Sequence, residues 1–230
     1  MLKNLKGIIF DVHKTLVDDS GFPRERIWKL LLQSGAKFSM TEYYRLYDDL
    51  TKRLFNWAEI GNFIKIREIH KKRLVELYQR YNVKRDIEQD INYLWHSMGE
   101  SKIYPEVPYV LKFLQKKFKI GLLSNADNDD PLIDILLKKE FLFDVIITSE
   151  AAKAYKPKPI IFEKILSEMN CQKHQVIMVG DSQVSDVLGA KNFGIKVAWI
   201  NRTTEVLRED YPKPGYQISD LRQLIDIIEI

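Results

Sequence analysis

The stretch of sequence that decides the fold is Gly7-Ile8-Ile9-Phe10-Asp11-Val12-His13-Lys14-Thr15-Leu16. Its first four residues form a short apolar run, and the carboxylate of Asp11 follows that run directly. Apolar runs of this length that are rich in β-branched residues are typical of strands covered on both faces of a sheet. We therefore predict a buried strand at residues 7–10, with Asp11 at its carboxyl end.

Four similar runs occur later in the chain, at residues 120–123, 145–147, 176–179 and 197–200. Amphipathic stretches that are long enough for crossover helices alternate with these runs, at residues 109–117, 131–139, 159–169 and 185–193. Strands that alternate with helices of this length indicate a parallel sheet with helices on its faces. The predicted fold is α/β, a doubly wound parallel sheet.

One interval departs from this alternation. Residues 20–98 contain no strand-like run, and their charged and aromatic residues recur at helical spacing. Such a block between the first and second strands is best explained as a helical insertion, and Pro105 and Pro108 mark the return to the core. We predict a core of residues 1–18 and 99–230 and a small all-helical domain of residues 19–98.

Composition limits the classes of function. The 230 residues are 45% hydrophobic, and the formal net charge of +4 comes from positive and negative charges mixed along the chain. No apolar run is long enough for a membrane helix, and no basic cluster interleaves with aromatic residues as in a nucleic-acid module. The single cysteine, Cys171, excludes a secreted disulfide scaffold. We expect a cytoplasmic protein, a monomer or homodimer, with neither a membrane nor a nucleic-acid partner.

Polar residues gather where the predicted strands end. In doubly wound sheets, ligands bind beyond the carboxyl ends of the strands. The polar residues that follow the strands, or precede the helix before the fourth strand, are Asp11, Ser124, Asn125, Lys156, Asp181 and Asp186. We expect these side chains to converge on one edge of the sheet.

This set of residue types suits phosphoryl transfer. Mg²⁺ binds few protein carboxylates and completes its shell with water and substrate phosphate, and Asp11 and Asp181 fit that requirement. The metal would reduce repulsion between Asp11 and a phosphate ester, so that Asp11 could form an aspartyl-phosphate for water to hydrolyse. Lys156 would hold the carboxylate and a phosphate oxygen, and Ser124 would donate a hydrogen bond to the transferring group.

Four motifs in order carry a family resemblance. They are Asp-x-x-x-Thr-Leu at residues 11–16, Leu-Ser-Asn at 123–125, Tyr-Lys-Pro-x-Pro-x-x-Phe at 155–162, and Gly-Asp-Ser-x-x-x-Asp-x-x-Gly-Ala at 180–190. Together they resemble the motifs of the phosphatase-type haloacid dehalogenase (HAD) hydrolases, and the predicted insertion falls where that family carries a helical cap that closes over the site.

The resemblance also implies roles for individual residues. It implies a catalytic set of Asp11, His13, Ser124 and Lys156, a phosphate-binding set of Thr15, Ser124, Asn125 and Lys156, and Mg²⁺ ligands from Asp11, the His13 backbone carbonyl, Asp181 and Asp186. The implied substrate is a small phosphorylated molecule.

One position departs from the phosphatase pattern. His13 stands where these phosphatases have the second aspartate that serves as acid and base, and Lys14 stands where they have glycine. Histidine can move protons near neutral pH, but a nearby Mg²⁺ and Lys156 disfavour imidazolium, so His13 is a better base than acid. We expect aryl and acyl phosphates to be cleaved far faster than alkyl phosphates.

Structural explanations compete with functional ones at several of these residues. Ser182 and Asp186 could cap a helix, and we expect capping for Ser182 and a place in the metal shell for Asp186. Asp129 and Asp130 precede Pro131 as the N-cap region of a helix does, and we leave both out of the site.

Two other functions stay open at this stage. A 2-haloacid dehalogenase also lacks the second aspartate, and residues 199–202 resemble that branch, but it has tyrosine at position 13 and lacks the Gly180-Asp181 pair. A non-catalytic binding or regulatory protein on the same scaffold is the third possibility. Metal dependence separates the first two, because displacement of a halide by Asp11 requires no magnesium.

Overall fold

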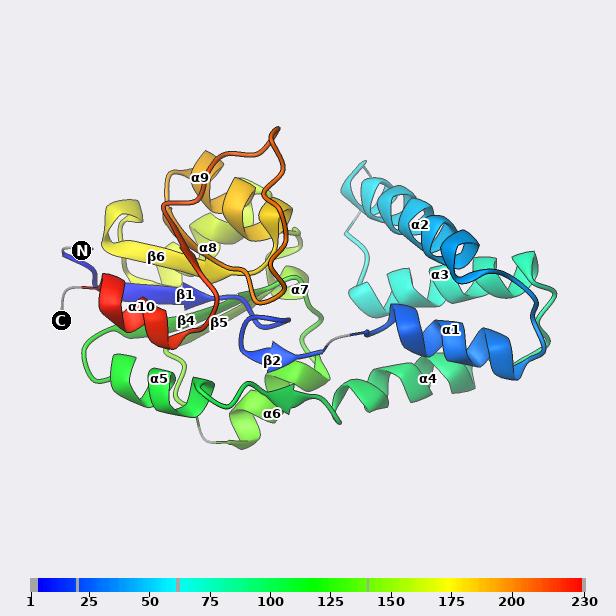
Figure 1. The fold of residues 1–230 in the computed structure, drawn as a ribbon. Coiled ribbons are helices and arrows are strands. Elements are labelled where there is room, and N and C mark those ends of the chain that lie inside the picture. The colour runs from blue at the N-terminus through cyan, green and yellow to red at the C-terminus, as the bar shows by residue number, and fades with distance from the viewer. Residues whose placement is uncertain (1–3, 20, 61–62, 140, 229–230) are drawn as a thin grey trace. The chain divides into compact units, whose positions relative to one another are not determined.

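The computed structural model describes residues 4–19, 21–60, 63–139 and 141–228, with the side chains of residues 56–60 also left aside. The chain divides into two compact units, one of residues 1–18 and 102–230 and one of residues 19–101. The division falls at Ser101 and not at Met98, because the amides of residues 99–101 still donate hydrogen bonds to the last turn of the preceding helix. Figure 1 labels the elements of each unit.

The first unit is built on a six-stranded sheet of order β5-β4-β1-β6-β7-β8, and every pair of neighbours in it is parallel. Its strands are β1 (Gly7–Phe10), β4 (Lys119–Ser124), β5 (Val145–Thr148), β6 (Val176–Gly180), β7 (Lys196–Ile200) and β8 (Tyr216–Ile218). The five predicted runs correspond to β1, β4, β5, β6 and β7, and the predicted α/β doubly wound sheet is confirmed.

Helices cover both faces of this sheet (Figure 1). They are α5 (Val107–Leu114), α6 (Pro131–Lys138), α7 (Ser149–Ala152), α8 (Pro159–Met169), α9 (Gly189–Phe193) and α10 (Arg222–Ile227), with a short 3-10 turn, η1 (Lys173–Gln175), and a π-helical turn, η2 (Gln183–Leu188). One hydrophobic cluster joins the sheet to α8 and α9 and includes Met178, Phe162 and Trp199, all fully or almost fully buried. This packing fixes β6 and β7, which carry part of the site.

A short antiparallel ribbon of β2 (Val17–Asp18) and β3 (Lys102–Ile103) also belongs to the first unit. Val17 pairs with Ile103, and Asp18 pairs with Lys102. The two points at which the chain leaves for the second unit and returns from it therefore face each other across one ribbon.

The second unit is helical, as expected from the periodicity of residues 20–98. Its helices are α1 (Arg24–Gln33), α2 (Met40–Ile60), α3 (Ile66–Arg80) and α4 (Ile87–Met98). Apolar and aromatic side chains from all four helices form a core of its own, with Leu31, Tyr43, Leu74 and Leu94 buried in it. Many aromatic residues of the insertion thus pack in or against this core.

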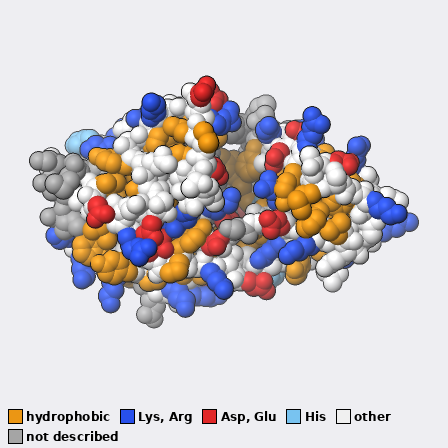
Figure 2. All heavy atoms as spheres, in the orientation of Figure 1, with side chains coloured by type: hydrophobic (Ala, Val, Ile, Leu, Met, Phe, Trp, Pro, Cys, Tyr) orange, Lys and Arg blue, Asp and Glu red, His pale blue; other side chains and the backbone are white. Residues whose placement is uncertain are grey.

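The surface has no single-sign patch on the face seen in Figure 2, where lysine and arginine side chains alternate with aspartate and glutamate. Across the part of the chain that the structure describes, no helix is both long and apolar enough to cross a membrane.

Candidate active site

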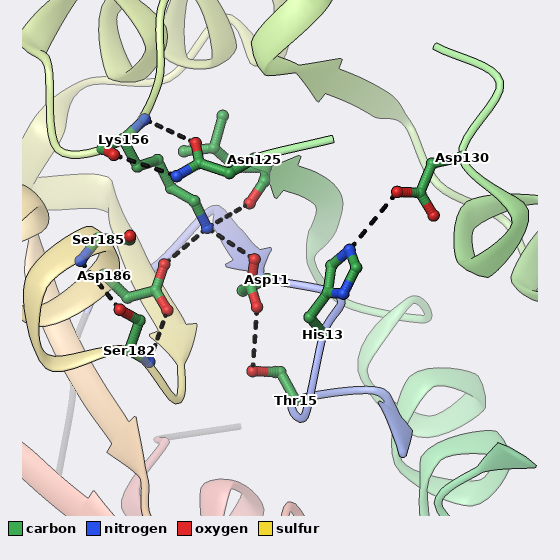
Figure 3. Close-up of polar contacts among 10 residues, drawn as sticks. Asp11, His13, Thr15, Asn125, Asp130, Lys156, Ser182, Ser185 and Asp186 are labelled. Atoms are coloured by element: carbon green, nitrogen blue, oxygen red, sulfur yellow. Dashed lines mark hydrogen bonds and ion pairs between the residues drawn. The ribbon is translucent and has the colours of Figure 1, made fainter. Parts of the chain in front are cut away.

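A buried lysine lies at the centre of the candidate site. The Lys156 ammonium donates to Asp11 Oδ1 at 2.7 Å, to Asp186 Oδ1 at 2.6 Å and to the Leu123 carbonyl at 2.8 Å (Figure 3). Lys156 is only 3% exposed, and the two carboxylates are 5% and 0% exposed. The structure therefore brings together three of the residues that the sequence placed at this edge of the sheet.

Asn125 fixes the backbone from which Lys156 projects. The Lys156 amide donates to Asn125 Oδ1 at 2.7 Å, and Asn125 Nδ2 donates to the Lys156 carbonyl at 3.1 Å. A side-chain amide that bonds both the N–H and the C=O of one residue holds that residue in a single orientation. In this structure Asn125 thus positions Lys156.

The segment after β6 carries Asp186 and one further carboxylate, Asp181. Ligand oxygens of Asp11, Asp181 and Asp186 all lie within 4.8 Å of one another. The π-helical turn η2 carries Asp186, whose Oδ2 accepts from the Ser182 amide at 3.0 Å, and Trp199 Nε1 donates to the Asp181 carbonyl at 2.7 Å. Irregular turns of this kind are frequent at functional sites.

Gly180 makes this arrangement possible. A Cβ atom at residue 180 would lie 2.3 Å from both Cγ and Oδ2 of Asp186, far inside van der Waals contact. Only glycine allows the end of β6 and the Asp186 carboxylate to approach so closely.

Burial and the charges of neighbouring groups together shift the pKa values of Asp181, Asp186 and Lys156. Burial raises the pKa of Asp186 to about 6, against the lowering effect of Lys156, and the negative charge of Asp11 adds to the increase. Burial likewise raises the pKa of Asp181 well above its ordinary value, and Asp11 and Asp186 add to it. Burial opposes the charged form of Lys156, but the attraction of Asp11 and Asp186 outweighs it, so the pKa of Lys156 is raised and the ammonium persists.

Two hydroxyl groups predicted for phosphate binding lie at the same edge. Ser124, the last residue of β4, is 1% exposed, and its Oγ has no hydrogen-bond partner among the residues that the structure describes. A buried hydroxyl without a partner is costly, so such a group indicates a ligand. Thr15 Oγ1 lies 3.5 Å from Asp11 Oδ2, which is longer than an ordinary hydrogen bond.

The predicted helix caps are also present. Ser182 Oγ accepts from the Ser185 amide at 3.1 Å, which confirms the expected capping role. Asp130 Oδ1 accepts from the Leu132 amide at 2.8 Å at the start of α6, and this confirms the N-cap.

Asp130 nevertheless has a second contact that the sequence analysis missed. Its Oδ2 lies 3.5 Å from His13 Nε2, and Figure 3 shows the imidazole turned toward it. The signal was available, because Asp130 lies between β4 and α6, at the same carboxyl edge that pointed to Ser124. Capping is a sufficient explanation of an aspartate before a helix, so the sequence pattern does not indicate the second contact.

Comparison with known proteins decides the family. The model of the haloacid dehalogenase-like hydrolases matches residues 5–194, most of the chain. The chain belongs to this family. It is a hydrolase by that membership, and the resemblance carried by the four motifs is confirmed.

Relatives of this HAD hydrolase include phosphatases and dehalogenases. The N-acylneuraminate-9-phosphatase of Rattus norvegicus is 24% identical over 99% of this chain and 95% of its own length. The glyceraldehyde 3-phosphate phosphatase of Pyrococcus furiosus is 28% identical over 99% and 95%. The (S)-2-haloacid dehalogenase of Pseudomonas sp. strain YL is 28% identical, but over only 55% of each chain.

Solved structures agree on the fold. The HAD hydrolase YfnB of Bacillus subtilis, a structure bound to magnesium, superposes with a TM-score of 0.76 at 20% identity and covers 99% of this chain and 100% of that one.

Proposed function

We propose that this HAD hydrolase is a magnesium-dependent phosphatase of small phosphate esters that acts through an aspartyl-phosphate on Asp11. The observation that carries the proposal is the cluster of three carboxylates around a single buried ammonium. The two phosphatase relatives named above each align over 99% of the chain, whereas the dehalogenase aligns over 55%, and this favours phosphate esters as substrates.

The carboxylate cluster suits a divalent cation. Three carboxylates gather around one buried lysine, and burial together with their mutual repulsion raises the pKa values of Asp181 and Asp186. Oxygen donors at this spacing are those that Mg²⁺ prefers, and the residues that would hold it are Asp11, Asp181, Asp186 and the backbone carbonyl of His13. When bound, the metal would neutralise charge on the phosphate that Asp11 attacks.

The chain's own residues then account for the two steps. Asp11 attacks phosphorus, and the bond from phosphorus to the ester oxygen breaks, which leaves an aspartyl-phosphate. Lys156 keeps Asp11 in place, and the ammonium can share its charge with a phosphate oxygen. The partnerless hydroxyl of Ser124 would donate to another of those oxygens, with Thr15 at the same edge.

His13 would act in the second step. It accepts a proton from water, the water oxygen attacks phosphorus, and the bond from phosphorus to Asp11 breaks to release inorganic phosphate and restore the carboxylate. Because the first step lacks a dedicated acid, aryl phosphates should react far faster than alkyl phosphates, beyond their intrinsic difference in reactivity. If aryl and alkyl phosphates were cleaved at rates that differ only by their intrinsic reactivity, this role for His13 would be contradicted.

We also propose that the helical unit of residues 19–101 is the substrate-selecting cap of this enzyme. It has its own core, and its connections to the α/β unit are confined to one ribbon. These two features suit an element that can vary without disturbing the catalytic residues.

The second candidate is a 2-haloacid dehalogenase, favoured by the dehalogenase relative and by residues 199–202. In that reaction Asp11 displaces halide from carbon, and no cation is required. Nothing in such a reaction would offset the cost of gathering Asp181 and Asp186 beside Asp11, which is why the phosphatase is preferred.

The test is hydrolysis of p-nitrophenyl phosphate with Mg²⁺ and with EDTA, on the native chain and on Asp11→Asn. We expect activity that requires both the metal and Asp11, with Asp11→Asn lower by more than about a thousandfold because the nucleophile is lost. Metal-independent release of chloride from 2-chloropropionate, without phosphatase activity, would support the dehalogenase instead. A folded chain that is inactive in both assays would favour a binding protein.

A further inference from the structure

Asp130 has one carboxylate oxygen that helix capping does not use. The residue is 1% exposed, and Oδ1 caps α6 through the Leu132 amide. Oδ2 is buried and has no hydrogen-bond partner among the residues that the structure describes. Leaving a carboxylate oxygen buried without a partner costs free energy, so a purely structural cap does not explain it.

The imidazole of His13 faces that oxygen. His13 Nε2 lies 3.5 Å from Asp130 Oδ2, slightly beyond a formed hydrogen bond and within the range of an ion pair. The His13 side chain is 27% exposed and comes from the loop after β1, whereas Asp130 comes from the loop after β4. Figure 3 shows the two side chains directed toward each other beside Asp11.

The helix makes Asp130 a rigid partner. Because Oδ1 is held at the N-terminus of α6 and Pro131 follows at its first position, the carboxylate cannot rotate without breaking the cap. Oδ2 therefore keeps a fixed direction, toward His13.

A fixed acceptor selects one form of a neutral imidazole. In a neutral imidazole one ring nitrogen carries hydrogen and donates a hydrogen bond, and the other nitrogen accepts one. The group that accepts from the ring decides which of the two nitrogens carries the hydrogen. An ionised carboxylate can only accept, so Asp130 favours hydrogen on Nε2 and leaves Nδ1 as the accepting nitrogen. The same logic orients histidine in catalytic triads, where a buried carboxylate holds the ring.

We infer that Asp130 is a positioning residue that holds the His13 imidazole in one orientation and one tautomer for the water step. This inference rests on the proposed function, in which His13 accepts a proton from the water that hydrolyses the aspartyl-phosphate. The proton passes from that water to Nδ1 and then to solvent, and Asp130 neither gains nor loses one.

Two substitutions separate positioning from capping. Serine, asparagine and aspartate are comparable N-caps, so Asp130→Ser and Asp130→Asn both keep the cap of α6. Serine is too short to reach His13, and asparagine can place an N–H group where the carboxylate stood. The control for loss of an aspartate cap is Asp86→Ser, because Asp86 is the N-cap of α4, with Oδ1 accepting from the Gln89 amide at 2.9 Å.

The kinetic test uses p-nitrophenyl phosphate on the full chain with Mg²⁺. If only the second step slows, kcat and KM fall together by about tenfold to a hundredfold, kcat/KM stays unchanged, and a burst of nitrophenol equal to the enzyme concentration precedes the steady state. We expect this pattern for Asp130→Ser, Asp130→Asn and His13→Ala. Adding Asp130→Ser to His13→Ala should produce no further loss, since both remove the same function. Asp86→Ser should match the native chain.

A merely structural effect would look different, because a partly unfolded sample loses burst amplitude and kcat while KM stays constant. Native kcat and KM in Asp130→Ser, or full additivity with His13→Ala, would overturn the inference.

A second readout does not depend on activity. Long-range ¹H–¹⁵N correlation spectra report which ring nitrogen of each histidine carries hydrogen, and the His13→Ala variant identifies the signal of His13. We expect hydrogen on Nε2 in the native chain and in Asp86→Ser, and a shift toward Nδ1 or a mixture in Asp130→Ser. An unchanged tautomer in Asp130→Ser would overturn the positioning role even if the chain proved not to be a phosphatase, whereas a shifted tautomer in a chain without phosphatase activity would reject only the proposed reaction.

Discussion

Two buried aspartates, one in each unit, each contact a basic side chain, yet their pKa values are shifted in opposite directions. In the helical unit, Asp90 accepts from Arg85 Nε and Arg85 Nη2 at 2.6 Å each and from the Tyr78 hydroxyl at 2.6 Å. In the α/β unit, Asp186 accepts from Lys156 at 2.6 Å. The pKa of Asp90 is lowered, whereas the pKa of Asp186 is raised to about 6.

The difference lies in how strongly burial acts on each carboxylate and in how many carboxylates share its cation. Burial alone would raise the pKa of Asp90, but hydrogen bonds from Arg85 and Tyr78 outweigh burial. Burial also has the largest influence on the pKa of Asp186. The Lys156 ammonium that Asp186 contacts is shared with Asp11. A structural network satisfies its charges internally, while the site gathers carboxylates whose charge a proton or a bound cation can offset.

The largest test of this comparison is Lys156→Met. Removing the ammonium leaves the Asp11 and Asp186 carboxylates buried without a cation, which should lower the free energy of unfolding by about 3–5 kcal/mol. Phosphatase activity should fall by more than about a thousandfold, because Asp11 loses its position. Denaturant unfolding and p-nitrophenyl phosphate hydrolysis measure the two effects.

The control for that variant is Lys164→Met, because Lys164 forms an exposed ion pair with Glu168 on α8. It should change the free energy of unfolding by less than about 1 kcal/mol. Similar losses of the free energy of unfolding in both variants would show that the buried Lys156 contributes no more to stability than an exposed lysine.

The sharpest test is a pair of isosteric substitutions that should change stability in opposite directions. Without metal at pH 7.5, Asp181→Asn removes one of three repelling carboxylates and should raise the free energy of unfolding by about 1 kcal/mol. Asp90→Asn removes the charge that Arg85 and Tyr78 stabilise and should lower it by about 2 kcal/mol. Thermal melts with EDTA measure both, and changes of the same sign would remove the distinction between the two regions.

A smaller effect concerns pH. Because the pKa of Asp186 is raised from 3.8 to about 6, the folded chain keeps a proton that the unfolded chain has released, and metal-free stability should fall as pH rises through this window. Mg²⁺ must displace that proton, so its apparent affinity should be about tenfold weaker at pH 5 than at pH 7. Calorimetric titration of Mg²⁺ at the two pH values provides the measurement. Equal affinities would mean that Asp186 is already ionised at pH 5.

The sequence was most informative where apolar residues form a continuous run. Strands β1, β4, β5, β6 and β7 were predicted because each carries a run of apolar residues. In β8 only Ile218 is buried, because this strand lies at the edge of the sheet, and no run marks it. Strands β2 and β3 have two residues each, too few for any periodicity.

In the candidate site, too, the residues that were predicted are those with a local signal in the sequence. Asp11, Ser124, Lys156 and Asp186 each lie beside a strand end or a motif, so the sequence placed them together, and their catalytic roles are proposals. The contact between Asp130 and His13 depends on how the loops after β1 and β4 approach each other, which no spacing along the chain encodes. The mutual repulsion of the carboxylates likewise became apparent only with the distances between them.

The β2–β3 ribbon bears on how this protein can be altered by engineering. Since Asp18 and Lys102 are partners in one antiparallel pair, the ends of the helical insertion are only about 5 Å apart. A two-residue Asn-Gly turn is enough to close such a gap. The helical unit can therefore be deleted, or exchanged for the insertion of another HAD hydrolase, with both splice points placed beyond the last paired residues of the ribbon.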